Sequence, residues 1–250
     1  MTTTHIFILC HNERVLLPET IAHYRTRIPG CEITIYDNMS TDDSVAIAKA
    51  HGCNVIEWVS PVFGPDQIDD FEYIRIKNNC WRHLSSGWVI VIDMDEWLCV
   101  TQDDLDNERE AGTTILKVIG LNIIGDSKTV DLSDINMHEL RNYMAHYPES
   151  KSLCFLKDAI SEMNYTAGAH GCNPRGHIVY SAKQYINKHM CHMGVEFYAN
   201  KLKERHKRAA AMHRNGLAGH YTNDMDHHIS HQRNLIEESK NSILENEDPI

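Results

Sequence analysis

Short apolar runs alternate with helical patterns through about the first hundred residues of the chain. Continuous apolar runs predict buried strands, because a strand covered on both faces lacks polar alternation. Leu17, Ile21, Tyr24 and Ile28 recur every three or four positions, which is typical of one helix face. The predicted strands are 5–10, 32–37, 54–58 and 88–92, and the predicted helices are 13–28, 42–51 and 68–84. This alternation favours an α/β fold with a doubly wound, mostly parallel sheet.

The second half of the chain has a less regular pattern. Residues 114–124 predict a strand or a bent hairpin, and the glycine-rich stretch 165–176 predicts a loop. We expect a basic helix over 196–215 and an acidic helix or tail over 232–247. Shorter strands are expected at 152–156, 177–181 and 187–192. No repeat or linker divides the chain, so we expect one domain over residues 1–250 with an irregular C-terminal half.

Polar clusters follow three of the predicted strands, at 11–13, 37–40 and 93–96. The carboxyl ends of parallel strands meet at one edge of a sheet, where ligands bind. Asp93 and Asp95 could hold Mg²⁺ or Mn²⁺ while substrate phosphates complete the coordination, although such a pair also forms ordinary turns. Asp37 could accept hydrogen bonds from a nucleoside base or ribose and is the expected functional member of its cluster. Alternatively, an Asx-turn with a helix cap explains Asn38, Ser40 and Asp42 without a ligand.

The composition favours a globular protein and argues against several function classes. Of the 250 residues, 42% are apolar and 24% are charged, which is typical of a folded domain. The net charge of −11 makes the chain a poor general binder of nucleic acid, since phosphate contacts require a positive surface. No apolar run approaches the roughly 18 to 20 residues of a membrane span. Without a signal-peptide pattern, the eight cysteines are expected to be reduced thiols in the cytoplasm.

One stretch of the chain is basic, although the chain as a whole has a negative net charge. Residues 200–215 hold six lysines or arginines and one glutamate. Lys201 and Arg205 lie one helical turn apart and could meet a diphosphate, whereas a solvated helix face is the favoured interpretation for Arg205. The stretch is therefore a candidate phosphate-binding segment.

The order of these motifs resembles that of GT-A-fold glycosyltransferases, and within them the family-2-like and family-92-like enzymes. There an Asp-x-Asp pair is usually followed by glutamate and an aromatic residue, as in Asp93-Met94-Asp95-Glu96-Trp97. The resemblance is collinear over residues 5–98 and weaker at Gly168-Ala169-His170 and at His192-Met193, where the family often has His-Tyr. Residues 102–147 have no match. Its other motifs are Asn12-Glu13, Glu19, Tyr36-Asp37-Asn38-x-Ser40-x-Asp42 and Asn79-Cys80.

The resemblance implies a metal-dependent glycosyltransferase with a nucleotide-sugar donor and a glycan or other hydroxyl acceptor. It implies a Rossmann-like GT-A fold with a nucleotide-binding half (1–100), an acceptor-side half (101–222) and a C-terminal helical tail (223–250). The implied nucleotide contacts are Asn12, Glu13, Asp37, Asp93 and Lys201. The implied ligands of Mn²⁺ or Mg²⁺ are Asp93, Asp95 and, from the second half, His192 and His170.

We expect the reaction to invert the anomeric carbon. Inversion requires a base that takes the proton of the acceptor hydroxyl during attack. Asp158 closely follows the predicted strand 152–156 and is the expected base, with Glu162 as the alternative. Both acids could also be ordinary surface residues.

Two other functions remain open at this point. A sugar-phosphate nucleotidyltransferase usually has a glycine-rich phosphate loop after its first strand, where this chain has His11-Asn12-Glu13-Arg14. A non-catalytic module would bind a nucleotide sugar without turning it over. Release of pyrophosphate would identify the first, and binding without turnover the second.

Overall fold

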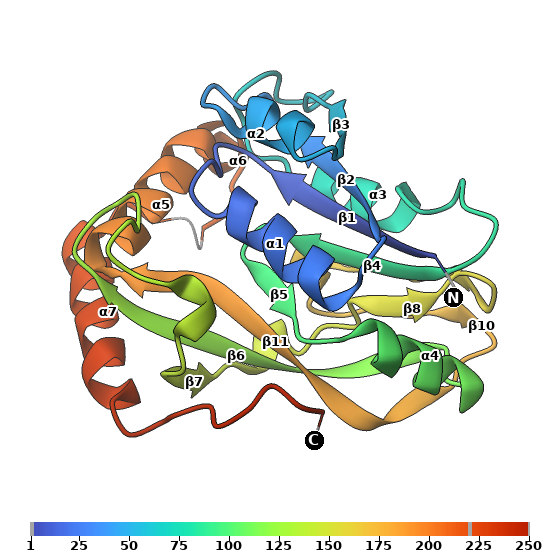
Figure 1. The fold of residues 1–250 in the computed structure, drawn as a ribbon. Coiled ribbons are helices and arrows are strands. Elements are labelled where there is room, and N and C mark those ends of the chain that lie inside the picture. The colour runs from blue at the N-terminus through green and yellow to red at the C-terminus, as the bar shows by residue number, and fades with distance from the viewer. Residues whose placement is uncertain (1–2, 220–221, 250) are drawn as a thin grey trace.

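A nine-stranded sheet organises the structure, a computed structural model that describes residues 3–219 and 222–249 (Figure 1). The strand order is β3-β2-β1-β4-β8-β6-β11-β5, with β7 paired to β6. These strands are β1 (Thr4–Cys10), β2 (Glu32–Asp37), β3 (Asn54–Glu57), β4 (Trp88–Asp93), β5 (Glu96–Leu98), β6 (Ile115–Ser127), β7 (Tyr143–Ala145), β8 (Cys154–Leu156) and β11 (Tyr180–Gly194). A separate two-stranded sheet joins β9 (Ile160–Glu162) and β10 (Arg175–Gly176). The two ends of the expected domain, at Met1 and Ile250, lie outside the described residues.

The helices begin where the sequence offers stabilising end groups. Asp69 accepts hydrogen bonds from two backbone N–H groups at the start of α3, and Thr101 and Asp104 form a capping box at the start of α4. No helix of the described residues combines the length and the apolar character that crossing a bilayer requires. The helices are α1 (Leu17–Arg27), α2 (Ser44–Ala50), α3 (Asp70–Asn79), α4 (Gln102–Glu110), α5 (Val195–Arg208), α6 (Ala210–Arg214) and α7 (Met225–Ser239), with short 3₁₀ helices η1 (Met137–Glu139), η2 (Tyr147–Glu149) and η3 (Ala167–Ala169).

Most strands of the large sheet run in one direction. β3, β2, β1 and β4 are mutually parallel, with Ile6 opposite both Ile33 and Ile90. β8 is antiparallel to β4 and to β6, so β6 and its parallel neighbour β11 run in the same direction as β4. β5, β7 and β8 run in the opposite direction. The predicted α/β fold with a mostly parallel sheet is therefore confirmed.

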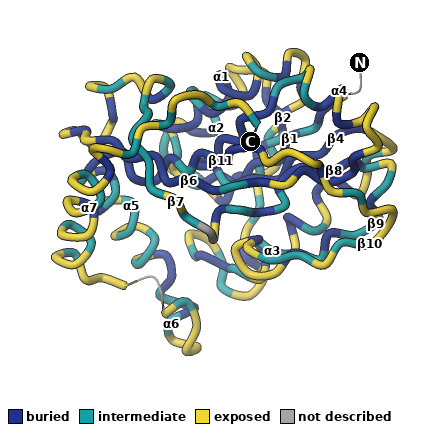
Figure 2. The backbone as a smooth tube through the Cα atoms, turned by 90° about the horizontal axis from the view of Figure 1, so that it is seen from below, coloured by how far each residue is buried: buried dark blue, intermediate teal, exposed yellow. Residues whose placement is uncertain are grey.

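Helices cover both faces of the parallel strands. Successive side chains of β1 point to opposite faces, so Ile6 packs in one core with Ile21 of α1, and Phe7 packs in a second core with Ile76 of α3. Figure 2 shows the central strands buried, while α6 and α7 carry exposed positions. This arrangement confirms the doubly wound prediction and leaves the strand ends free to form a ligand site.

The second half departs from the predicted elements. β11 is one strand of 15 residues where the pattern predicts two, because it continues through the exposed positions 182–184, which include Lys183 and Gln184. The basic helix is divided at Ala209 into α5 and α6. α7 ends at Ser239, so of the two expectations for 232–247 the helix holds for the first part and the tail for the last. There the chain is extended, and Leu244 N donates to Arg141 O at 2.8 Å.

A buried histidine on α1 predicts acid sensitivity. His23 Nε2 donates to Leu98 O at 3.0 Å, and its ring stacks on Trp97 at 5.0 Å between centroids. Burial lowers the pKa of His23 from 6.5 to about 3. The unfolded chain therefore binds a proton that the folded protein does not, and stability falls as pH drops from 6.5 towards 3. We expect His23 to account for a loss of about 1.4 kcal/mol per pH unit inside this window.

Urea unfolding at several pH values across this window measures the slope. His23→Gln keeps a donor for the Leu98 carbonyl but has no titrating ring, so the variant should lose this part of the pH dependence. Equal slopes in the two proteins would show that His23 is not the source.

Candidate active site

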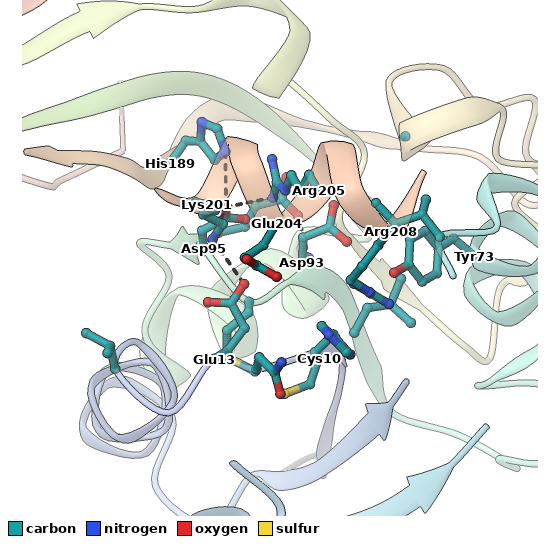
Figure 3. A pocket seen from close by; sticks show the side chains of 18 of the residues that line it. Cys10, Glu13, Tyr73, Asp93, Asp95, His189, Lys201, Glu204, Arg205 and Arg208 are labelled. Carbon is teal, nitrogen blue, oxygen red and sulfur yellow. Dashed lines mark hydrogen bonds and ion pairs between the residues drawn. The ribbon is translucent and has the colours of Figure 1, made fainter. Parts of the chain in front are cut away.

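A cavity of about 730 Å³ lies at the carboxyl ends of β1 and β4 and faces α5. Ligand pockets commonly span roughly 300 to 1,000 Å³, so the cavity can take a nucleotide-sized molecule. Its charged lining includes Glu13, Asp93, Asp95, Lys201 and Arg205 (Figure 3). The structure therefore brings the predicted clusters 11–13 and 93–96 together at one edge of the sheet.

The turn between β4 and β5 fixes the two aspartates. The backbone N–H of Asp93 donates to Glu96 Oε2 at 2.7 Å, and the hydroxyl of Thr20 on α1 donates to Met94 O at 3.0 Å. Both aspartates line the cavity. Local hydrogen bonds thus fix the backbone of the turn that carries the two carboxylates.

Asp95 is surrounded by cationic groups from α5 and by a histidine of β11. Its Oδ2 lies 2.9 Å from Lys201 Nζ, 3.4 Å from Arg205 Nη2 and 3.7 Å from His189 Nε2. Burial would raise the pKa of Asp95, but Lys201 and His189 lower it well below the usual range. Asp95 is therefore an ionised carboxylate at neutral pH.

Asp93 faces two buried lysines instead. Its Oδ2 lies 2.8 Å from Lys77 Nζ and 3.6 Å from Lys151 Nζ. Burial raises the pKa of Asp93, but these two ammonium groups together lower it by more, so the pKa lies below its usual value. Lys151 Nζ also lies 2.8 Å from Glu96 Oε1 and 2.9 Å from Glu149 Oε2. The acids around β4 are therefore balanced by lysines inside the protein, and the two aspartates have different surroundings.

Asp95, His189 and Cys191 could hold a metal ion. One ligand atom of each lies within 4.8 Å of the others. His189 and Cys191 are two positions apart on β11, so both point to the same face of the sheet. Mg²⁺ favours oxygen ligands, whereas imidazole and thiolate donors beside a carboxylate suit a transition-metal ion. The residues therefore fit a divalent ion at Asp95.

The histidine beside Asp95 is His189 and not the expected His192. His192 Nδ1 is hydrogen-bonded to Gln232 Oε1 of α7 at 2.8 Å, away from the aspartates. The register of β11 against β6 shifts between His189 and His192, so the regular alternation of a strand does not give the directions of their side chains. The sequence pattern alone does not show this irregularity, so it cannot indicate which of the two histidines lies beside Asp95.

His170 does face the cavity, from the loop around η3. Its Nδ1 donates to Pro148 O at 2.8 Å, so Nε2 is the proton acceptor of the neutral ring. A Cβ at Gly168 would lie 2.4 Å from this Nε2, and Gly168 has φ +63°. Glycine is therefore required there, both for the turn and for the position of His170.

The predicted nucleoside contacts have different roles. Asn12 and Glu13 line the cavity, and Asn12 Oδ1 accepts from Thr41 N at 2.7 Å, which ties the loop after β1 to the loop after β2. Asp37 is 1% exposed, and Ser40 donates to it from its N–H at 2.9 Å and from its hydroxyl at 2.5 Å. Asp37 therefore stabilises a turn through Ser40, and its contact with a nucleoside stays a prediction.

Asp158 lies away from the cavity. Its Oδ2 accepts from the N–H of Gly87, just before β4 begins, at 3.2 Å, and lies 3.6 Å from Arg109 Nη1. The prediction treats strand 152–156 as parallel to β4, whereas β8 is antiparallel to it. The carboxyl end of β8 therefore lies at the opposite edge of the sheet, and the structure does not bring Asp158 to the candidate site.

Arg208 is a site residue that the sequence reasoning missed. It is 5% exposed and lines the cavity, where its Nη2 donates to Asn38 Oδ1. Lys201, Arg205 and Arg208 follow one another at spacings of four and three, which places them on one face of α5. That spacing could have identified it. Lys77, Lys151 and His189 were also missed, and Lys151 carries no local signal at all.

Comparison with known proteins gives limited similarity. No model of a protein family matches the chain. The sequence is 28% identical to protein RfbJ of Shigella flexneri over 114 residues, which cover 46% of this chain and 74% of RfbJ. Glucosyl-3-phosphoglycerate synthase from Mycobacterium tuberculosis matches with 21% identity and a TM-score of 0.33, over 48% of this chain and 44% of the synthase. TarS of S. aureus, residues 1–349, matches with 13% identity and a TM-score of 0.42, over 83% and 65% of the two chains.

Proposed function

We propose that this chain is a glycosyltransferase that moves a sugar from a nucleotide-sugar donor to a hydroxyl of a glycan or a smaller acceptor. One observation carries the proposal: the Asp93–Asp95 turn faces the cationic side of α5 across a single cavity. Such a site offers carboxylates for a divalent ion and cations for a diphosphate. The mycobacterial synthase has been solved with UDP-glucose and Mn²⁺, which supports the same class of donor here.

Different residues of the chain bind different parts of the donor. His11, which follows β1, and Arg208, at the end of α5 and bonded to Asn38 after β2, take the nucleoside side. Lys201 and Arg205 take the diphosphate. Asp95 and His189 would hold the divalent ion, for which we propose Mn²⁺. When bound, such an ion supplies positive charge against the leaving diphosphate. In this proposal one domain binds both the donor and the acceptor. The cytoplasmic location expected from the sequence is also part of the proposal.

We propose inversion with His170 as the base in place of Asp158. The acceptor oxygen bonds to the anomeric carbon as the bond to the diphosphate breaks, and the acceptor proton passes to His170 Nε2. His170 lines the cavity, and its Nδ1 is engaged with Pro148. Glu149 also lines the cavity, but its contact with Lys151 makes it a weaker acceptor. The anomeric configuration of the product, determined by NMR, tests inversion.

Binding of UDP in the presence of Mn²⁺ tests the proposed pocket. At about 100 times its dissociation constant, a ligand stabilises the folded state by about 2.7 kcal/mol, which a thermal-shift assay detects. Arg208→Gln should weaken UDP binding about tenfold or more, because a hydrogen bond to a charged group contributes about 1.5 to 3 kcal/mol. Isothermal titration calorimetry gives the affinities.

Arg214→Gln is the matched control, because Arg214 is exposed on α6 and the substitution removes the same charge. It should leave the affinity for UDP unchanged. Equal weakening in both variants would indicate a general charge effect. A wild-type protein that binds no nucleoside diphosphate would refute the proposed function.

A further inference from the structure

A lysine ammonium group occupies the space beside the carboxylate that would hold the metal. Lys201 Nζ lies 2.9 Å from Asp95 Oδ2 and 3.0 Å from Glu13 Oε1. The Lys201 side chain is 10% exposed and that of Asp95 is 3% exposed. Figure 3 shows Lys201 between these two acids and next to Arg205. Asp95 therefore already has a cationic partner that belongs to the protein.

The same oxygen serves both the lysine and the candidate metal group. His189 Nε2 lies 3.7 Å from Asp95 Oδ2, the atom that Lys201 contacts. Cys191 completes the group on the neighbouring position of the β11 face. A divalent ion held by Asp95 and His189 would thus lie next to the ammonium group. Like charges at such short range repel each other strongly in a site that water hardly enters, and a divalent ion is repelled more strongly than a monovalent one.

The contacts of Lys201 allow the two cations to exchange. Lysine is a point charge on a flexible four-carbon stem, so its ammonium group can leave Asp95 without moving α5. Glu13 lies on its other side and can keep the ion pair when the contact with Asp95 is lost. Arg205 extends from the next turn of the helix, and both side chains line the cavity.

We propose that Lys201 is a built-in competitor of the metal ion: it neutralises Asp95 in the metal-free protein and must move aside when a divalent ion binds. The competitor role follows from these contacts alone. If the proposed function also holds, the displaced ammonium group is available to the donor diphosphate, so the lysine would link metal binding to the arrival of the nucleotide sugar.

Titration of the full chain with Mn²⁺ alone tests the competitor role without any measurement of activity. Calorimetry, with free Mn²⁺ followed by electron paramagnetic resonance, gives the dissociation constant. We expect Lys201→Met to bind Mn²⁺ at least tenfold more tightly than the wild-type protein, and Lys201→Arg, which keeps the charge, to remain close to wild type. Lys203→Met removes the same charge from an exposed position of α5 and should not tighten binding.

Circular dichroism and the thermal midpoint establish that each variant is folded. Equal or weaker Mn²⁺ binding in folded Lys201→Met, equal tightening in Lys203→Met, or no Mn²⁺ binding in any variant would overturn the proposal. Its failure is separable from failure of the proposed function. A protein that transfers sugar but shows no effect of Lys201 on Mn²⁺ affinity refutes only the competitor role, and one that binds no nucleotide can still show that effect.

Discussion

Asp95→Asn is expected to lower the rate of sugar transfer by about 10³-fold, the upper range for loss of one preorganised electrostatic partner. The substitution removes the carboxylate that contacts Lys201, Arg205 and His189 together. It leaves a nearly isosteric amide, so packing around the buried side chain is retained. Release of nucleoside diphosphate measures the rate, and circular dichroism verifies the fold.

Asp103→Asn serves as the matched control for this effect. Asp103 is exposed on α4, and its replacement changes the net charge by the same amount. It should leave the rate within about twofold of wild type, as surface substitutions have small effects. A near-normal rate in a folded Asp95→Asn protein would show that the carboxylate of the β4–β5 turn is not needed for sugar transfer.

Glu247→Gln is expected to destabilise the fold by about 3 kcal/mol. Glu247 lies in the extended segment after α7, where its Oε1 is 2.6 Å from Lys188 Nζ and 3.4 Å from Arg141 Nη1, and its Oε2 pairs with Arg27. The Lys188 side chain is 2% exposed, so losing the carboxylate leaves a buried ammonium without its counter-charge. At roughly 2 to 4 °C per kcal/mol for a protein of this size, Tm should fall by about 6 to 12 °C.

Glu245→Gln provides the comparison within the same segment. Glu245 is exposed, and the substitution removes one negative charge two residues away. Its Tm should stay within about 2 °C of wild type. If both variants were equally stable, the C-terminal segment would contribute nothing through Glu247, and the three cations would have to be stabilised by other groups.

The parallel half of the fold is readable from the sequence because one physical signal dominates it. β1 and β4 are buried on both faces and appear as unbroken apolar runs, and α1 shows a regular apolar stripe. β11 is different because polar positions interrupt it, and β8 has only three residues. The direction of so short a strand depends on its neighbours, which explains why Asp158 appears on the ligand side in the sequence and at the opposite edge in the structure.

The candidate site shows the same contrast between residues on regular elements and residues on irregular ones. Asp93, Asp95 and Glu13 adjoin the ends of predictable strands, so topology alone brings them together. His189 depends on a register shift in β11, and Lys151 on the path of an irregular segment. Neither feature has a local periodic signal. His189 and the two lysines that balance Asp93 were therefore less predictable than Lys201 and Arg205.

The central claim is transfer from a nucleotide sugar at this cavity, and product release from a panel of nucleotide sugars with Mn²⁺ tests it most directly. The wild-type protein should release nucleoside diphosphate from at least one member, slowly to water and faster with a hydroxyl acceptor, and Asp95→Asn should not. Release of pyrophosphate from a nucleoside triphosphate and a sugar phosphate, or tight binding with no release from any nucleotide sugar, would contradict the account.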